Sequence, residues 1–168
     1  MQKRQIAART SGLVFVIGIL MGAGQPVAAE GGTSEHDTRA QSRAIEGVWE
    51  PVVTIIDCVT KAPLVSFLSM DSYIRGGSYV GESASEPAIR ATGLGTWRHA
   101  GGRNFTALYQ FFTYAPDGTP NGKLKVSARI RLSADGKSFR TSDTSELLAL
   151  DGTVITQVCA TRVATRFE

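Results

Sequence analysis

The clearest pattern along the chain is a strict alternation of apolar and polar residues between Lys123 and Ser133. Every second position is aliphatic, and the positions between them hold lysine, arginine or serine. A period of two places the aliphatic side chains on one face of a β-strand, whereas a helix would scatter them around its surface. The sequence therefore predicts a strand over 123–133 with one buried face and one face in water.

Seven more apolar-rich runs are separated by turn-forming dipeptides. The dipeptides are glycine pairs, or glycine after Asp or Asn, at 76–77, 101–102, 117–118, 121–122, 135–136 and 151–152. Such residues tolerate the positive φ angles of tight hairpins. The predicted strands are 48–56, 65–74, 79–83, 94–99, 104–114, 123–133, 139–148 and 154–167. No long helix is predicted.

Eight strands joined by short turns predict an all-β fold, most simply an eight-stranded up-and-down antiparallel barrel. Closure removes the two exposed edges that an open meander would have. Cys58 ends the first predicted strand and Cys159 lies within the last. A disulfide between them is what closure permits, because the first and last strands then become neighbours. A two-sheet sandwich is the alternative, and the absence of a Cys-x-x-Cys spacing disfavours a redox-active pair.

The first 29 residues have the features of a secretory signal peptide. Lys3, Arg4 and Arg9 precede an apolar run over 13–21, and small residues allow cleavage near Ala29. The alternative is a retained N-terminal anchor. We expect a signal peptide over 1–29, a flexible segment over 30–45 with one helical turn near its end, and the barrel domain over 46–168. The mature protein is then secreted or periplasmic, an oxidising setting for the two cysteines.

Cleavage changes the charge of the chain. The full sequence has 18 Lys and Arg against 15 Asp and Glu, and the three cations within 1–29 leave 15 against 15. Nucleic-acid binding loses its support, since it needs a clustered cationic excess. No later segment has the roughly 20 apolar residues that span a bilayer.

Five aromatic residues are candidates for the lining of the barrel. They are Trp49, Tyr73, Phe105, Tyr109 and Phe111. An eight-stranded barrel either fills its interior with side chains or holds one small ligand. Both outcomes stay open, and a ligand in this lining would be a small apolar molecule.

Residues for catalysis or metal binding are scarce. His36 falls in the N-terminal segment and His99 near a hairpin, and no spacing matches a metal site or a nucleophile elbow. No catalytic residue, metal or cofactor is predicted. Asp71 and Asp143 lie in mid-strand, where an inward carboxylate would have to be paired and would be a candidate functional acid. We expect both to face outward, into solvent.

Gly47-Val48-Trp49 at the start of the first strand resembles the Gly-x-Trp signature of lipocalins and other calycins. In those families the Trp closes one end of the barrel and packs against an arginine near the last strand. The resemblance implies that role for Trp49 with Arg162 or Arg166.

The chain also resembles a group of secreted bacterial proteins of unassigned function. The shared motifs here are Asp57-Cys58, Arg75-Gly76-Gly77, Gly95-Thr96-Trp97, Cys159-Ala160-Thr161 and Arg166-Phe167-Glu168. The lipocalin-like architecture implies a non-catalytic module that binds a small apolar ligand. The alternatives are a protein-interaction module, such as a periplasmic protease inhibitor acting through residues 30–45, and a cofactor-free barrel cyclase.

Overall fold

The computed structural model describes residues 40–84 and 90–167. The predicted signal peptide, His36 and the part of the flexible segment before residue 40 lie outside the described residues. Among those that are described, no helix is long and apolar enough to cross a membrane.

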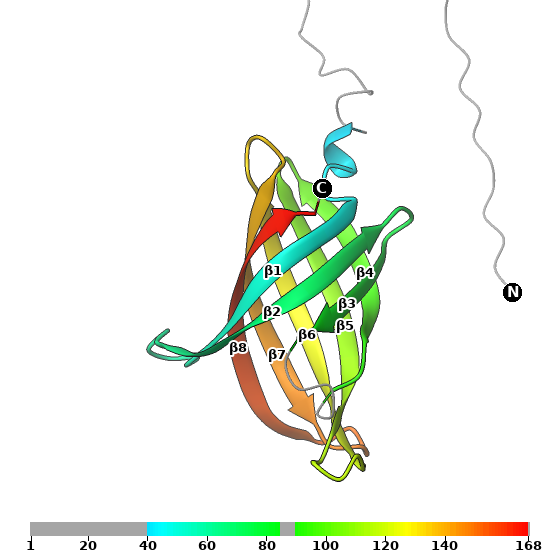
Figure 1. Cartoon of the computed structure of the whole chain (residues 1–168), viewed down its shortest axis with the longest axis vertical. Coiled ribbons are helices and arrows are strands. Elements are labelled where there is room, and N and C mark those ends of the chain that lie inside the picture. The colour runs from blue at the N-terminus through cyan, green and yellow to red at the C-terminus, as the bar shows by residue number, and fades with distance from the viewer. Residues whose placement is uncertain (1–39, 85–89, 168) are drawn as a thin grey trace, which may run out of the picture. The chain divides into compact units, whose positions relative to one another are not determined.

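Eight antiparallel strands pair in chain order and close into one barrel (Figure 1). They are β1 (Gly47–Ile56), β2 (Pro63–Ile74), β3 (Ser78–Ser83), β4 (Gly93–Gly101), β5 (Asn104–Tyr114), β6 (Pro120–Leu132), β7 (Ser138–Leu148) and β8 (Val154–Arg166). The predicted up-and-down barrel is confirmed, and the sandwich alternative is wrong.

The alternation that predicted β6 gives that strand its two faces. Val126, Ile130 and Leu132 are buried inside the barrel, whereas Arg129 and Arg131 are exposed outside it. Each inward aliphatic side chain leaves water, which stabilises the fold by about 1.5–3 kcal/mol for a fully buried one.

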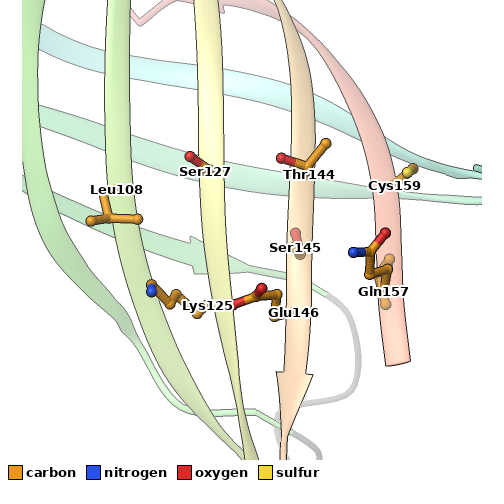
Figure 2. Close-up of a pocket in the computed structure, with 9 residues that line it drawn as sticks. Leu108, Lys125, Ser127, Thr144, Ser145, Glu146, Gln157 and Cys159 are labelled. Atoms are coloured by element: carbon orange, nitrogen blue, oxygen red, sulfur yellow. The ribbon is translucent and has the colours of Figure 1, made fainter. Parts of the chain in front are cut away.

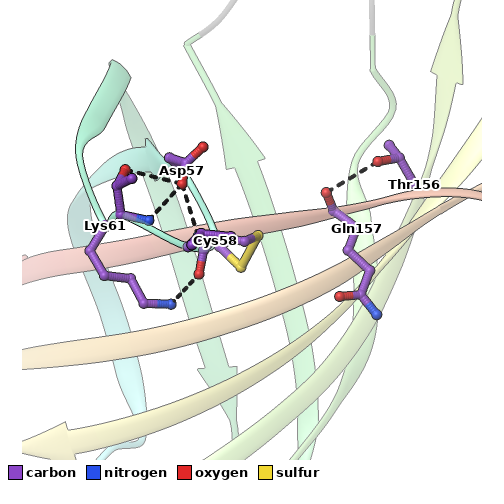
Figure 3. Close-up of a disulfide and its surroundings, with 8 residues drawn as sticks. Asp57, Cys58, Lys61, Thr156 and Gln157 are labelled. Carbon is purple, nitrogen blue, oxygen red and sulfur yellow. Dashed lines mark hydrogen bonds between the residues drawn. A yellow bond between two sulfur atoms is a disulfide. The ribbon is translucent and has the colours of Figure 1, made fainter.

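The seam between β1 and β8 closes the barrel. Its register runs from Trp49 opposite Arg166 to Ile56 opposite Cys159. Just beyond Ile56, Cys58 forms the predicted disulfide with Cys159, with a Cα–Cα distance of 5.2 Å (Figure 3). The cross-link therefore fastens one end of the seam.

A tight turn presents Cys58 to β8. The Asp57 carboxylate accepts hydrogen bonds from the backbone N–H groups of Val59, at 2.9 Å, and Thr60, at 2.7 Å. These bonds lower the pKa of Asp57. Lys61 adopts a positive φ of 63° and donates from Nζ to the Cys58 carbonyl at 2.6 Å (Figure 3).

The opposite end of the seam is sealed by the chain that precedes β1. Residues 40–45 make a helical turn, and Ile45 at its end is fully buried. The Trp49 indole donates from Nε1 to the Ile45 carbonyl at 2.9 Å. We call this the sealed end of the barrel.

Candidate functional site

The interior of the barrel divides into a packed half and a half with a cavity. The packed half lies at the sealed end, where Trp49 and Tyr73 contact Phe139 with ring centroids 4.9 and 5.9 Å apart. Phe105 packs there against Trp97 at 6.1 Å. Three of the five aromatic residues expected to line a pocket, Trp49, Tyr73 and Phe105, therefore belong to the solid core.

The other two, Tyr109 and Phe111, line a cavity of about 50 Å³ in the second half. Its apolar wall is completed by Val53, Ile55, Phe67, Leu124, Val126, Val158 and Ala160, and its polar lining by Ser69, Tyr79, Arg90, Asp143, Ser145 and Arg162. Drug-sized ligands occupy pockets of roughly 300 Å³ or more, whereas this space has room for only about three water molecules. Most of the interior is thus filled by side chains.

A buried charge cluster forms the polar side of the cavity. The Arg162 guanidinium donates from Nη1 to Asp71 Oδ2 at 2.5 Å and from Nε to Asp143 Oδ2 at 2.8 Å. Tyr79 donates its hydroxyl to the second oxygen of Asp71 at 2.9 Å. All three charged side chains are almost completely buried.

The expectation that Asp71 and Asp143 face solvent is therefore wrong. The physical reason is Arg162, whose guanidinium supplies each carboxylate with the partner that makes its burial tolerable. A signal was present in the sequence, because Asp71 lies two residues before the inward Tyr73 and must share its face of β2.

Backbone and hydroxyl groups hold the cluster in place. The Ser69 hydroxyl lies 2.6 Å from the Glu82 carbonyl and 3.2 Å from Asp71 Oδ1. The Arg162 backbone N–H donates to Thr141 Oγ1 at 3.0 Å. These contacts join β2 to β3 and β8 to β7 next to the guanidinium.

A glycine provides the space for one of the aromatic rings. Gly95 on β4 lies opposite Tyr109 on β5. A Cβ atom at Gly95 would overlap the carbonyl oxygen of Leu108 and the side chain of Tyr109. The close approach lets the Tyr109 ring reach within 4.5 Å of the Tyr79 ring and 5.4 Å of the Arg162 guanidinium.

Burial raises the pKa values of acidic groups in the site. Desolvation raises the pKa of Asp143, and the Arg162 guanidinium only partly opposes this effect. Desolvation also raises the pKa of Tyr109 to about 12, so this phenol is neutral at physiological pH.

Four buried polar side-chain atoms of the described residues have no protein partner, and three of them belong to residues that line the cavity; the fourth, the Tyr73 hydroxyl, lies in the packed half. Among the described residues, Arg162 Nη2, Asp143 Oδ1 and Arg90 Nε are buried without a protein partner, and all three residues line the cavity. The Arg90 guanidinium lies 4.2 Å above the Phe111 ring. The cavity therefore offers two N–H donors and one carboxylate acceptor to a guest. Sequence reasoning missed Arg90 and Tyr79, and nothing in the local pattern marks Arg90.

Trp49 meets one of its two expected arginine partners. The Arg166 guanidinium lies 4.2 Å above the Trp49 ring and donates to three backbone carbonyls, those of Ala44, Glu46 and Gly136. Arg162 instead belongs to the charge cluster and does not contact Trp49 through any hydrogen bond or ring contact that the structure describes.

In the described part of the chain, no three His, Cys, Asp or Glu side chains come together in a group that could bind a metal ion. His99 lies at the β4–β5 hairpin, with Nε2 2.8 Å from the Gly102 carbonyl oxygen. No protein-family model matches the chain, and no curated protein is similar to it in sequence.

Proposed function

We propose that this chain is an exported, lipocalin-like barrel that binds one end of a small molecule in the interior cavity. The observation that carries the proposal is the set of unpartnered polar atoms, Arg162 Nη2 and Asp143 Oδ1, at the edge of an otherwise apolar space. Leaving such buried groups unpaired costs about 1–3 kcal/mol each. A guest that satisfies them recovers this free energy on binding.

The chemistry of the two atoms defines the head of the ligand. Arg162 Nη2 requires an acceptor and Asp143 Oδ1 requires a donor. One hydroxyl or primary amide group supplies both, and a few heavy atoms fit a space of about 50 Å³. The rest of the ligand would lie against half-buried apolar side chains of the cavity wall, among them Val53, Phe67 and Leu124.

Export is supported by two features of the chain. The basic and apolar pattern over 1–29 is typical of a signal peptide. The bond between Cys58 and Cys159 is of a kind that persists in oxidising compartments.

The test compares hexanamide with N,N-dimethylhexanamide, which keeps the acceptor but has no N–H donor. Titration of residues 30–168, followed by two-dimensional amide NMR, should show saturable shifts at the cavity residues for hexanamide. We expect binding about tenfold weaker for the dimethyl compound, because Asp143 Oδ1 then stays unpaired. Absence of saturable shifts with either compound contradicts the proposal.

A pair of variants on β8 provides the control. Ala160→Leu places extra side-chain volume in the cavity and should abolish binding of hexanamide. Val163→Leu alters an outward, half-exposed position of the same strand and should leave binding unchanged. Equal binding by both variants would place the ligand elsewhere.

A further inference from the structure

The outer surface of the barrel over β4–β7 carries a concentration of positive charge. Five exposed cations at outward positions of three of these strands make up what we call the basic face: Arg98, Lys125, Arg129, Arg131 and Arg140. On these four fully described strands, Glu146 opposite Lys125 is the one acidic residue at an outward position. The neutral net charge expected of the mature chain therefore conceals a strong separation of charge.

The arginines of this face form no ion pair with any of the described residues. The ion pairs of the described residues involve Arg43, Arg75 and Arg162, none of which lies on the basic face. Arg98 donates to Thr106 Oγ1 at 3.2 Å, which leaves its charge without a counterion. A surface that only needs solubility mixes both signs of charge, so the segregation calls for another explanation.

The basic face is hollowed along its length. Hollows of about 310, 420 and 200 Å³ are lined in turn by Arg98 with Arg129, by Arg129 with Arg131 and Arg140, and by Arg131 with Arg140. A fourth, of about 440 Å³, adjoins the first through Leu108 and Ser127 and reaches Lys125 (Figure 2). Because neighbouring hollows share lining residues, they form one continuous track across β4–β8.

The geometry of the track suits a chain that carries repeated negative charges. Neighbouring strands lie about 4.8 Å apart, and alternate residues of one strand about 7 Å apart, so the arginines form a regular array. Hydroxyl groups stand among them, from Thr106, Ser127 and Ser142. Among the outward side chains that line the four hollows there is no aromatic ring, and single-stranded nucleic acids rely on such rings for stacking; the outward aromatic residues of β5, Phe112 and Tyr114, line none of these hollows.

We propose that the basic face binds an anionic polysaccharide, with carboxylate or sulfate groups on the arginines and sugar hydroxyls on Ser and Thr. The site is separate from the interior cavity, so this inference does not depend on the proposed ligand. Binding is driven by release of counterions and weakens steeply with salt.

The test uses polygalacturonate, a carboxylated polysaccharide, and residues 30–168 of the protein. Calorimetry at low salt should detect binding to polygalacturonate and none to neutral dextran. The double variant Arg129→Gln/Arg131→Gln should bind at least about tenfold more weakly, with the slope of log affinity against log salt reduced by about two.

A second double variant, Lys61→Gln/Arg75→Gln, removes the same net charge away from the track. Its affinity should stay within about twofold of the original, because the lost charges do not touch the polymer. Equal losses in both double variants would overturn the proposal, as would no binding to polygalacturonate. Tighter binding to a dT oligonucleotide or to phosphatidylglycerol vesicles than to polygalacturonate would overturn it too. Unchanged melting temperatures confirm that the variants fold.

Discussion

Two arginines of β8, four residues apart, contrast in burial and in partners: Arg162 is buried and Arg166 is half-buried. Arg166 at the sealed end has its donors directed to three carbonyl oxygens and its face on the Trp49 ring. Arg162 in the middle of the barrel has two carboxylates, yet keeps Nη2 without a partner. An arginine such as Arg166, each of whose three guanidinium nitrogens donates to a backbone carbonyl, stabilises the fold. An arginine such as Arg162, with an unpartnered N–H donor beside a cavity, can bind a ligand there.

Of the changes that test this contrast between the two arginines, Arg162→Leu should lower the free energy of unfolding the most. This change strands two buried carboxylates, and breaking a buried ion pair by removing one partner costs about 3–5 kcal/mol. Urea unfolding measures the loss. Arg140→Leu, on the exposed face of β7, should change the free energy of unfolding by less than about 0.5 kcal/mol. A loss for Arg162→Leu no larger than this control would refute a stabilising role of the cluster.

The second largest loss of stability should come from removing the disulfide at the end of the β1–β8 seam. Replacing both cysteines, Cys58→Ser/Cys159→Ser, should lower the free energy of unfolding by about 2–4 kcal/mol, because a loop of 101 residues is no longer closed in the unfolded chain. The barrel should remain closed, since the β1–β8 hydrogen bonds persist. Far-UV circular dichroism and urea unfolding test both statements. A variant that lacks native circular dichroism would show that the hydrogen bonds alone cannot hold the seam.

A somewhat smaller effect is expected at the sealed end. Arg166→Ala removes the contact with Trp49 and leaves the carbonyl oxygens of Ala44 and Glu46 to find water, at a cost of about 2 kcal/mol. Hydrogen exchange should accelerate most in the turn over 40–45. An equal rise in hydrogen exchange across all strands would show that Arg166 does not stabilise the 40–45 turn specifically.

Much of the fold could be predicted from the sequence because strand alternation and turn dipeptides are local properties. The eight strands and the disulfide follow from them. The charge cluster could not be predicted in the same way, since its three members come from β2, β7 and β8 and become partners only when the barrel closes. Strand alternation could have placed Asp71 on the inward face with Tyr73, but it could not show that Arg162 would be the partner there.

The basic face was missed for a related reason. A count of charges over the mature chain does not say where they lie on the surface. Only the strand register shows that Arg131 lies opposite Arg140. Arg90 in turn lies outside the eight strands, where the period of two makes no prediction.

The smallest expected effect is a change in pH dependence at Asp143. Its pKa in the folded state is raised above the unfolded value, so between the two values the folded state holds a proton that the unfolded state has released. Its contribution to the free energy of unfolding must therefore decrease as pH rises through this window. In Asp143→Asn this contribution is absent.

The measurement is the difference in free energy of unfolding, original minus Asp143→Asn, from pH 3 to 7. Four turn residues, Asp57, Asp117, Asp135 and Asp151, have lowered pKa values and the opposite slope, but they are common to both proteins and cancel. The difference should fall as pH rises. A difference that is constant or increases would contradict the raised pKa.

The seam also dictates an order of events as the chain folds. Every other strand pair joins neighbours in sequence, whereas β1 must wait for residues more than a hundred positions away. Contacts of such long range are slow to form. We expect a meander from β1 to β7 to assemble first and the last strand to bring Arg162 between its two acids as it docks. Until that step the carboxylates of Asp71 and Asp143 remain hydrated. The docking of β8, the last step of folding, therefore also forms the polar side of the cavity.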